Sequence, residues 1–541
     1  MRRKLQTGVA EARYDQALGN FGPMVRPAMN VRSSVRYDGF VLSSVFLVWA
    51  VSGSAQSTVQ ALGPQHLSVA QPKIFASFPA LAGDPSMSYK DHPDMALAAC
   101  SGCGAGGQVL VATGQDVSLY DTSGKLLKTQ RTEAFIRAAG IDFEAWKSRP
   151  ALPPQAAGKV NDPRATYDPF IGRWILVCSC SGDFLMVSGS KDAAGDWKGV
   201  ALTDSAGDLT MFPGWDKNGV YIAEFQLKLN SQVIALPAAD VAWRGDRGIS
   251  LVHKAVFRDR PYEMRPAVDP NPKKKADDPE YLIARSGPPQ NGTNVAMDLL
   301  VDKIRWSGRR AEIVGPTIIP TGFLYNTPIP MPQPSGLPIR GNESHRVFSV
   351  SAYGGDLYLV EASGPCTSDC GVQGPDTNNL FYWFVIDPAT MTLRQKAKVS
   401  DPMLSLLFPT MALDGRGNAG IGVTGGASAQ QPSIYLFTHL ATDGAGKIDG
   451  PFLAHNGTEV YACAKGPDPK TVGWGTYSAT VQDGSDPMKL WTLQEYAGSA
   501  MPCVDHDGRG VSSATLSDGS AQAAAHQEAP ICTDMSSPNR R

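Results

Sequence analysis

Three glycines in the segment SGCGAGG, namely Gly102, Gly104 and Gly107, have the spacing of a dinucleotide-binding fingerprint. That fingerprint works only between a strand and a helix, because the helix N-terminus receives the pyrophosphate. Here the glycines are followed by QVLVATG, whose composition indicates a strand. We therefore interpret them as a flexible turn stapled by Cys100 or Cys103, and we expect no nucleotide site.

Motifs for metal or nucleophilic chemistry are absent from the sequence. The eight histidines include no H-x-H or H-E-x-x-H pair that would bring two imidazoles to one metal ion. The pair Cys100-x-x-Cys103 lacks a second such pair, and a disulfide explains it equally well. No G-x-S-x-G elbow occurs, which argues against a serine hydrolase of the α/β type. We expect neither a metal ion nor another cofactor.

Several aromatic residues have flat faces that suit stacking on sugar rings, above all Trp474 and Tyr477. Tyr167 and Trp174 are further examples. Tyr477 and Glu495 lie at opposite ends of one expected hairpin, where they could be cross-strand neighbours. Core packing is the alternative role for all of these aromatic side chains.

The elements that would position these residues are hairpins that recur along the chain. Six copies combine an apolar strand, a turn rich in Gly, Asp or Asn, and a strand heavy in aromatic and aliphatic residues; the clearest are NDPRATYDPFIGRWILVCSC, MFPGWDKNGVYIAEF and FPTMALDGRGNAGIGVTG. Pro163, Pro213 and Pro266 hold matching places in three copies. Repeats of about 40 to 50 residues are typical of four-stranded blades. The sequence predicts an all-β chain folded as a six- or seven-bladed β-propeller, with a β-sandwich as the alternative.

Two segments depart from the strand pattern. The segment 132–148 has apolar residues near helical spacing and Thr132 as a candidate N-cap, so we expect a short helical insertion there. The run Lys273-Lys274-Lys275, followed by two aspartates, is interpreted as a solvated loop between strands.

The two ends of the chain differ in composition from the repeats. Arg32 and Arg36 precede the apolar run FVLSSVFLVWAV and the small residues SGSA, which is typical of an export signal. This run is shorter than the roughly 20 residues that span a bilayer, so we expect no stable membrane span in the mature chain. The predicted segments are an unstructured upstream extension (1–28), a signal peptide (29–55), an N-terminal linker (56–83), the propeller (84–499) and a flexible, low-complexity C-terminal tail (500–541).

Charge and cysteine content fit an exported protein, either periplasmic or extracellular. Lys and Arg number 49 against 51 for Asp and Glu, and there is no basic stripe, so nucleic acid is not an expected partner. Nine cysteines fit an oxidising compartment, where thiols usually pair. Their connectivity stays open, although Cys366 and Cys370 are close enough in sequence to pair locally.

The segment GSKDAAGDW places Ser190, Asp192 and Trp197 at the spacing of an Asp box, S-x-D-x-G-x-x-W, with its glycine one place late. In such a turn the Asp binds turn amides and the Trp packs between blades, which is a structural role. With N-D-P-R-x-x-Y-D-x-x-x-x-R-W at 161–174 and F-P-x-x-A-L-D-x-x-G-N at 408–418, the chain resembles the sialidase-like β-propeller superfamily, and within it uncharacterised secreted bacterial proteins.

The resemblance implies where a ligand would bind. Sialidases hold a substrate carboxylate between three arginines, and Arg164, Arg265 and Arg346 lie at or near blade starts from which they could point into the central channel. A structural ion pair with an aspartate such as Asp162 or Asp269 is the alternative for each. The resemblance also implies a Tyr paired with Glu as nucleophile and an Asp as acid and base, but the early arginine motif of sialidases is missing here.

The sequence therefore predicts an exported binding propeller for a glycan, a peptide or an envelope component, including an envelope protein. A sialidase-like glycoside hydrolase is the alternative. The candidate ligand-facing residues are Asp162, Arg164, Arg265, Arg346, Trp474 and Tyr477.

Overall fold

A computed structural model describes residues 72–80, 95–147, 161–179, 182–203, 210–225, 231–286, 295–341, 347–367, 375–461, 470–474, 477–498 and 531–536. Strands dominate these ranges, and the three helices are short. The predicted extension at 1–28 and signal peptide at 29–55 lie outside the described residues, and so does Arg346.

Six sheets are each built from four consecutive antiparallel strands. In chain order they contain β2 (Ala96–Cys100), β3 (Gln108–Ala112), β4 (Asp116–Tyr120) and β5 (Leu126–Arg131); β6 (Asn161–Asp168), β7 (Arg173–Ser179), β8 (Asp183–Ser188) and β9 (Trp197–Ala201); β10 (Met211–Trp215), β11 (Gly219–Phe225), β12 (Ser231–Pro237) and β13 (Ala255–Arg260); β14 (Arg265–Pro266), β15 (Glu280–Arg285), β16 (Val295–Ser307) and β17 (Arg310–Tyr325); β19 (Val347–Tyr353), β20 (Asp356–Ser363), β21 (Leu380–Asp387) and β22 (Thr392–Val399); and β23 (Ser405–Leu413), β24 (Ala419–Ala427), β25 (Gln430–His439) and β26 (Asp449–His455).

A seventh four-stranded sheet takes its strands from both ends of the described chain. Its order is β28 (Ala479–Gln482), β29 (Lys489–Gln494), β30 (Ile531–Ser536) and β1 (Lys73–Pro79), with β1 antiparallel to β30. The sequence assigned these two outer strands to the linker at 56–83 and the tail at 500–541. Pairing between the two ends of a chain leaves no local signal, so neither strand was predicted.

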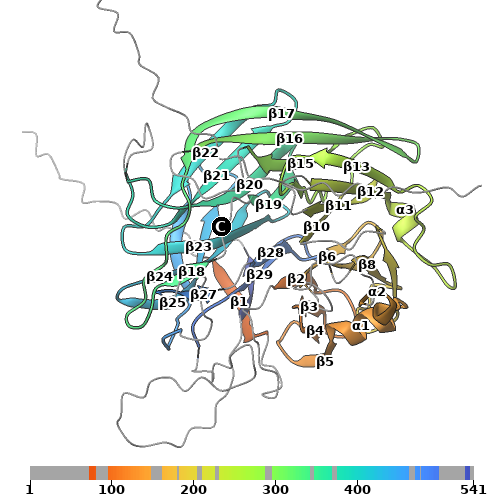
Figure 1. The fold of residues 1–541 in the computed structure, drawn as a ribbon, viewed down its shortest axis with the longest axis horizontal. Helices are drawn as coiled ribbons and strands as arrows, with labels where there is room; N and C mark the ends of the chain where they lie inside the picture. The colour runs from red at the N-terminus through yellow and green to blue at the C-terminus, as the bar shows by residue number, and fades with distance from the viewer. Residues whose placement is uncertain are drawn as a thin grey trace, which may run out of the picture. The chain divides into compact units, whose positions relative to one another are not determined.

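The first strands of the sheets line up around a closed ring. β2 contacts β6, β6 contacts β10, and the series continues through β14, β19, β23 and β28 back to β2 (Figure 1). Central strands such as β7 and β21 are buried on both faces because a neighbouring sheet covers each face. The chain is therefore a β-propeller, as predicted, in which six sheets of consecutive strands are closed by the sheet that joins the two ends.

An aspartate closes the first hairpin in five of the seven sheets. Each carboxylate accepts a hydrogen bond from the backbone N–H two residues further on, as in an Asx turn; the five are Asp168, Asp216, Asp269, Asp414 and Asp483. The β19–β20 hairpin uses Gly354 and Gly355 instead, both with positive φ. The prediction that Gly and Asp mark the strand reversals is confirmed.

The predicted helical insertion at 132–148 is present as two helices, α1 (Thr132–Ala138) and α2 (Phe143–Lys147). Gly140, with a φ of 89°, separates them. Thr132 was expected as the N-cap but is the first helical residue, and its hydroxyl donates instead to the carbonyl of Thr113. With α3 (Ala238–Val241) these are the helices of the described part of the chain, and each is far too short to cross a bilayer.

Lys274 corrects the interpretation of the lysine run at 273–275 as a solvated loop. Its side chain is buried, and its Nζ lies 2.7 Å from Asp216, 2.9 Å from Asp269 and 3.0 Å from Glu280. Burial alone would lower the pKa of Lys274, but the three carboxylates raise it above its usual value. Sequence could not separate this lysine from its two exposed neighbours, because Asp216 belongs to another sheet.

Candidate ligand site at one mouth of the channel

The first strands of the seven sheets, which we call the inner strands, all begin at one end of the ring. The backbone is strained at this end. Asp162, Glu263 and Phe408 have φ values of 45°, 53° and 52°. Asp162 is the second residue of β6, Glu263 precedes β14 by two residues, and Phe408 is the fourth residue of β23. Strands β6 and β23 also carry register shifts at this point. Left-handed non-glycine residues and bulges gather at functional sites, because they re-aim side chains. We call this end, marked by the three residues, the N-terminal mouth.

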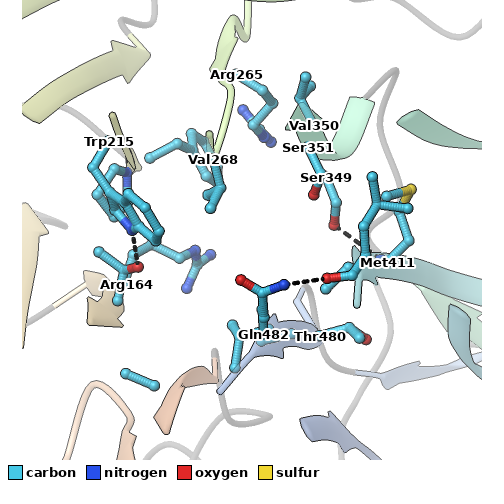
Figure 2. A pocket seen from close by; sticks show the side chains of 18 of the residues that line it. Arg164, Trp215, Arg265, Val268, Ser349, Val350, Ser351, Met411, Thr480 and Gln482 are labelled. Atoms are coloured by element: carbon cyan, nitrogen blue, oxygen red, sulfur yellow. Dashed lines mark hydrogen bonds between the residues drawn. The ribbon is translucent and has the colours of Figure 1, made fainter. Parts of the chain in front are cut away.

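A cavity of about 150 Å³ lies on the axis of the ring, lined by residues from all seven inner strands. Figure 2 shows the guanidinium groups of Arg164 and Arg265 pointing into this cavity from different sides. Phe212 and Tyr477 also line it, together with small and hydroxyl-bearing side chains such as Ser349. The cavity therefore combines two cations, aromatic faces and hydroxyl groups.

Arg164 is buried at the start of β6, with 8% of its surface exposed. Its Nη1 donates to the carbonyl of Pro163 at 2.6 Å, and its Cζ lies 3.6 Å from the ring centroid of Tyr477. Its Nη2 has no hydrogen-bond partner among the described residues. A buried guanidinium group with a spare N–H is suited to an anionic oxygen.

Arg265 lies at the start of β14, and its guanidinium group, like that of Arg164, faces the ring of Phe212. Its Cζ is 3.1 Å from the ring centroid of Phe212, and that of Arg164 is 5.4 Å from it. The Nη1 of Arg265 donates to the carbonyl of Glu263. Glu263 has a left-handed backbone conformation. Two arginines predicted from separate repeats are therefore brought together around one aromatic side chain.

Asp162 and Tyr477 meet through Thr210, which the sequence did not single out. The Thr210 hydroxyl is hydrogen-bonded to the Asp162 carboxylate and lies 2.9 Å from the Tyr477 hydroxyl. Tyr477 also packs against Phe212, with ring centroids 5.9 Å apart. Four predicted residues, Asp162, Arg164, Arg265 and Tyr477, thus belong to one constellation, although their roles stay predictions.

A second group of buried charges adjoins Arg265 and was missed by the sequence reasoning. Arg285, at the end of β15, is 3.1 Å from Glu361 on β20, and both are buried. Burial raises the pKa of Glu361 to about 8; Arg285 opposes this rise and Glu263 adds to it. A charged residue that follows the apolar stretch of a strand, as in EYLIAR and DLYLVEAS, was the available signal.

Trp474 does not line the cavity. It lies on β27 (Val472–Trp474), which pairs in parallel with β18 (Ile339–Gly341) outside the blades. There it is buried in an apolar cluster with Met331, Leu407 and Phe408, and its ring packs on Tyr461. Trp474 therefore packs in the cluster that contains Phe408 of β23 and does not line the cavity.

The residues of the predicted Asp box lie in the β8–β9 turn. The Asp192 carboxylate accepts from the amide of Ala194 at 2.9 Å and from the side chain of Gln108, which comes from the preceding sheet. The Ser190 hydroxyl accepts from the amide of Asp192, and the indole of Trp197 donates to the carbonyl of Ala193. These contacts tie the turn together and to its neighbour; membership of the Asp-box class stays a prediction.

Metal binding has no support in the described ranges, which hold no group of three or more His, Cys, Asp or Glu side chains placed to share an ion. Cys100 and Cys103 form a disulfide instead. Cys178 and Cys366 each take part in a separate disulfide.

Comparisons with known proteins add little beyond the fold. No known family profile matches the chain, and no curated protein is similar in sequence. Among solved structures, an ulvan lyase of polysaccharide lyase family PL25 is similar over 60% of this chain and 74% of its own, with 12% identity and a TM-score of 0.31. The Dos1 propeller is similar over 86% and 95%, with 9% identity and a TM-score of 0.35. These scores carry no argument about function.

Proposed function

We propose that this propeller binds an acidic glycan at the N-terminal mouth, with Arg164 and Arg265 holding a sugar carboxylate beside Phe212. The observation that carries the proposal is the convergence of the two buried guanidinium groups on one ring in the axial cavity. Guanidinium groups bind carboxylates through two parallel hydrogen bonds, and aromatic faces stack on sugar rings. Export to the periplasm or the cell exterior, where such glycans occur, is part of the proposal.

The test is binding of uronate-containing oligosaccharides and their neutral counterparts to the chain from Gln56 onward, measured by calorimetry. We expect only the acidic sugars to bind, and Arg164→Gln to weaken binding by about 10- to 100-fold, the equivalent of one charged hydrogen bond. Arg310→Gln, at an exposed arginine, is the matched control and should leave affinity unchanged. Equal binding of neutral sugars, or equal affinity of the Arg164 variant, would contradict the proposal.

Glycoside hydrolysis is the second candidate, and one observation favours it. The hydroxyl of Tyr477 is connected through Thr210 to the Asp162 carboxylate, next to the Arg164 guanidinium group. A tyrosine that can pass its proton along such a chain is a possible nucleophile for a glycosidic carbon. Turnover of chromogenic sialosides or uronides that is lost in Tyr477→Phe would favour hydrolysis, whereas retention without turnover would favour binding.

A further inference from the structure

We propose that the Cys100–Cys103 disulfide is a redox-sensitive lock on the closure of the ring. The disulfide lies in the β2–β3 turn, at the end of the first inner strand. Five of the other inner hairpins hold this place with an aspartate, and β19–β20 uses two glycines. In the first sheet the cross-link between Cys100 and Cys103 takes the place of the carboxylate.

The tip of this turn is held by the last sheet. The backbone N–H of Ser101 lies 3.0 and 2.9 Å from the two carboxylate oxygens of Asp483, in the β28–β29 turn. The N–H of Gly102 donates to the Ser485 hydroxyl at 2.6 Å, and the N–H of Gly484 donates back to the carbonyl of Ala99 at 2.8 Å. Bonds to a buried carboxylate are about twice as strong as neutral ones. The contact therefore joins the first sheet to the last.

The disulfide is what keeps the two amide groups in place. Gly104, Gly106 and Gly107 follow directly, with φ values of 57°, 90° and 76°. A segment with three left-handed glycines has a large conformational freedom when it is not cross-linked. The disulfide closes the turn before these glycines, so that Ser101 and Gly102 present their N–H groups to Asp483 and Ser485 together.

Reduction would release this turn. The thiolate of a dithiol such as dithiothreitol attacks one sulfur and releases the other cysteine as a thiolate. The second thiol of the reagent then attacks the mixed disulfide and releases the remaining cysteine. The protein disulfide gains two electrons and two protons to become two cysteine thiols, while the dithiol loses them and closes into a cyclic disulfide. Both protein sulfurs are buried, at 1% exposure, so the reaction follows local opening of the turn.

Hydrogen exchange of Cys100→Ala/Cys103→Ala tests the lock without touching the other disulfides. We expect the amides of Ser101, Gly102 and Gly484 to exchange at least about tenfold faster than in the unaltered chain. Amides between β20 and β21, across the ring, are the internal control and should be unchanged. Unchanged exchange at the turn would overturn the proposal.

Two further measurements separate a lock from a general loss of stability. Ser485→Ala should accelerate exchange at Gly102 in the disulfide-bonded chain, but add little in the Cys100→Ala/Cys103→Ala variant, because the two changes act on one contact. Additive effects would overturn the proposal. If the Cys100→Ala/Cys103→Ala variant does not fold, the same exchange measurement is made on the unaltered chain treated with dithiothreitol, with mass spectrometry to count free thiols. Protection at Ser101 that survives reduction of Cys100 and Cys103 would likewise overturn it.

Discussion

Buried charges are the unusual residues of this protein, and two groups of them differ in what compensates the charge. Arg164, Arg265 and the Arg285–Glu361 pair lie toward the N-terminal mouth, whereas Asp168 and Asp216 lie in turns at the opposite ends of inner strands. Burial of a charge is costly unless hydrogen bonds or an opposite charge compensate it. The turn carboxylates are compensated by backbone amides, while Arg164 keeps an N–H without a partner in the described chain. The first group thus fits binding and the second fits stability.

Asp168→Asn should change how stability depends on pH. Burial raises the pKa of Asp168 to about 7, against the lowering effect of the amides of Phe170 and Ile171. A carboxyl whose pKa is higher in the folded than in the unfolded chain binds protons more tightly when folded, so stability falls as pH rises from about 4 to about 7. From pH 5 to pH 8, the unaltered chain should lose on the order of 2 to 3 kcal/mol more than the variant.

Urea denaturation at several pH values checks this prediction. Asp121→Asn is the matched control, because Asp121 also accepts turn amides but its pKa is lowered, below the tested window. Parallel pH profiles for the unaltered chain and the Asp168 variant would show that Asp168 does not titrate in this range.

At the scale of elements, one hairpin design is repeated and then joined to its neighbours by side chains that differ from sheet to sheet. Lys274 joins the β14–β15 turn to Asp216 of the preceding sheet, and Gln108 joins β3 to the β8–β9 turn. Asp483 joins the last sheet to the first. The repeats therefore share their turns but not their lateral contacts, which is why the hairpins could be recognised in sequence and the contacts could not.

Lys274→Met should destabilise the protein by about 3 to 5 kcal/mol, because it leaves the buried carboxylates of Asp216 and Glu280 and the partly buried one of Asp269 without their cation. The loss should be greater at alkaline than at mildly acidic pH, because burial raises the pKa of Glu280 and its protonation at lower pH removes one of the charges that the variant leaves without a cation. Chemical denaturation measures the change. Lys273→Met, at the exposed neighbouring lysine, should have almost no effect, and similar losses for the two variants would refute the role of Lys274.

For the whole molecule, stability depends on closing the ring between sheets that lie far apart in the chain. Phe78 on β1 packs against Tyr120 of the first sheet and Trp491 of the last, with ring centroids 5.5 and 6.4 Å apart. It fills the space between these two sheets, which the chain joins through the consecutive strands β1 and β2. The aromatic contact and the Cys100–Cys103 turn thus act at the same seam.

Phe78→Ala should cost about 3 to 5 kcal/mol, as the loss of a buried aromatic side chain does. The seam should also become the first site of limited proteolysis, because the outermost strand of the closing sheet is the one that loses its anchor. Phe75→Ala on the same strand is the control, since that side chain is 54% exposed. Equal thermal midpoints for the two variants would contradict a role of Phe78 in ring closure.

The sequence by itself determined the repeated hairpins, the turn residues and the arginines at the blade starts. Each of these is a local pattern: alternation and Asx turns are set within a few residues, so Asp168 and Arg164 could be recognised from the segment NDPRATYD. Only the tertiary structure decided that Lys274 is buried, that Thr210 connects Asp162 to Tyr477, that Trp474 lies outside the cavity, and that β1 completes the last sheet. Those facts depend on which sheets become neighbours when the ring closes, and contacts between distant segments leave no periodicity in the chain.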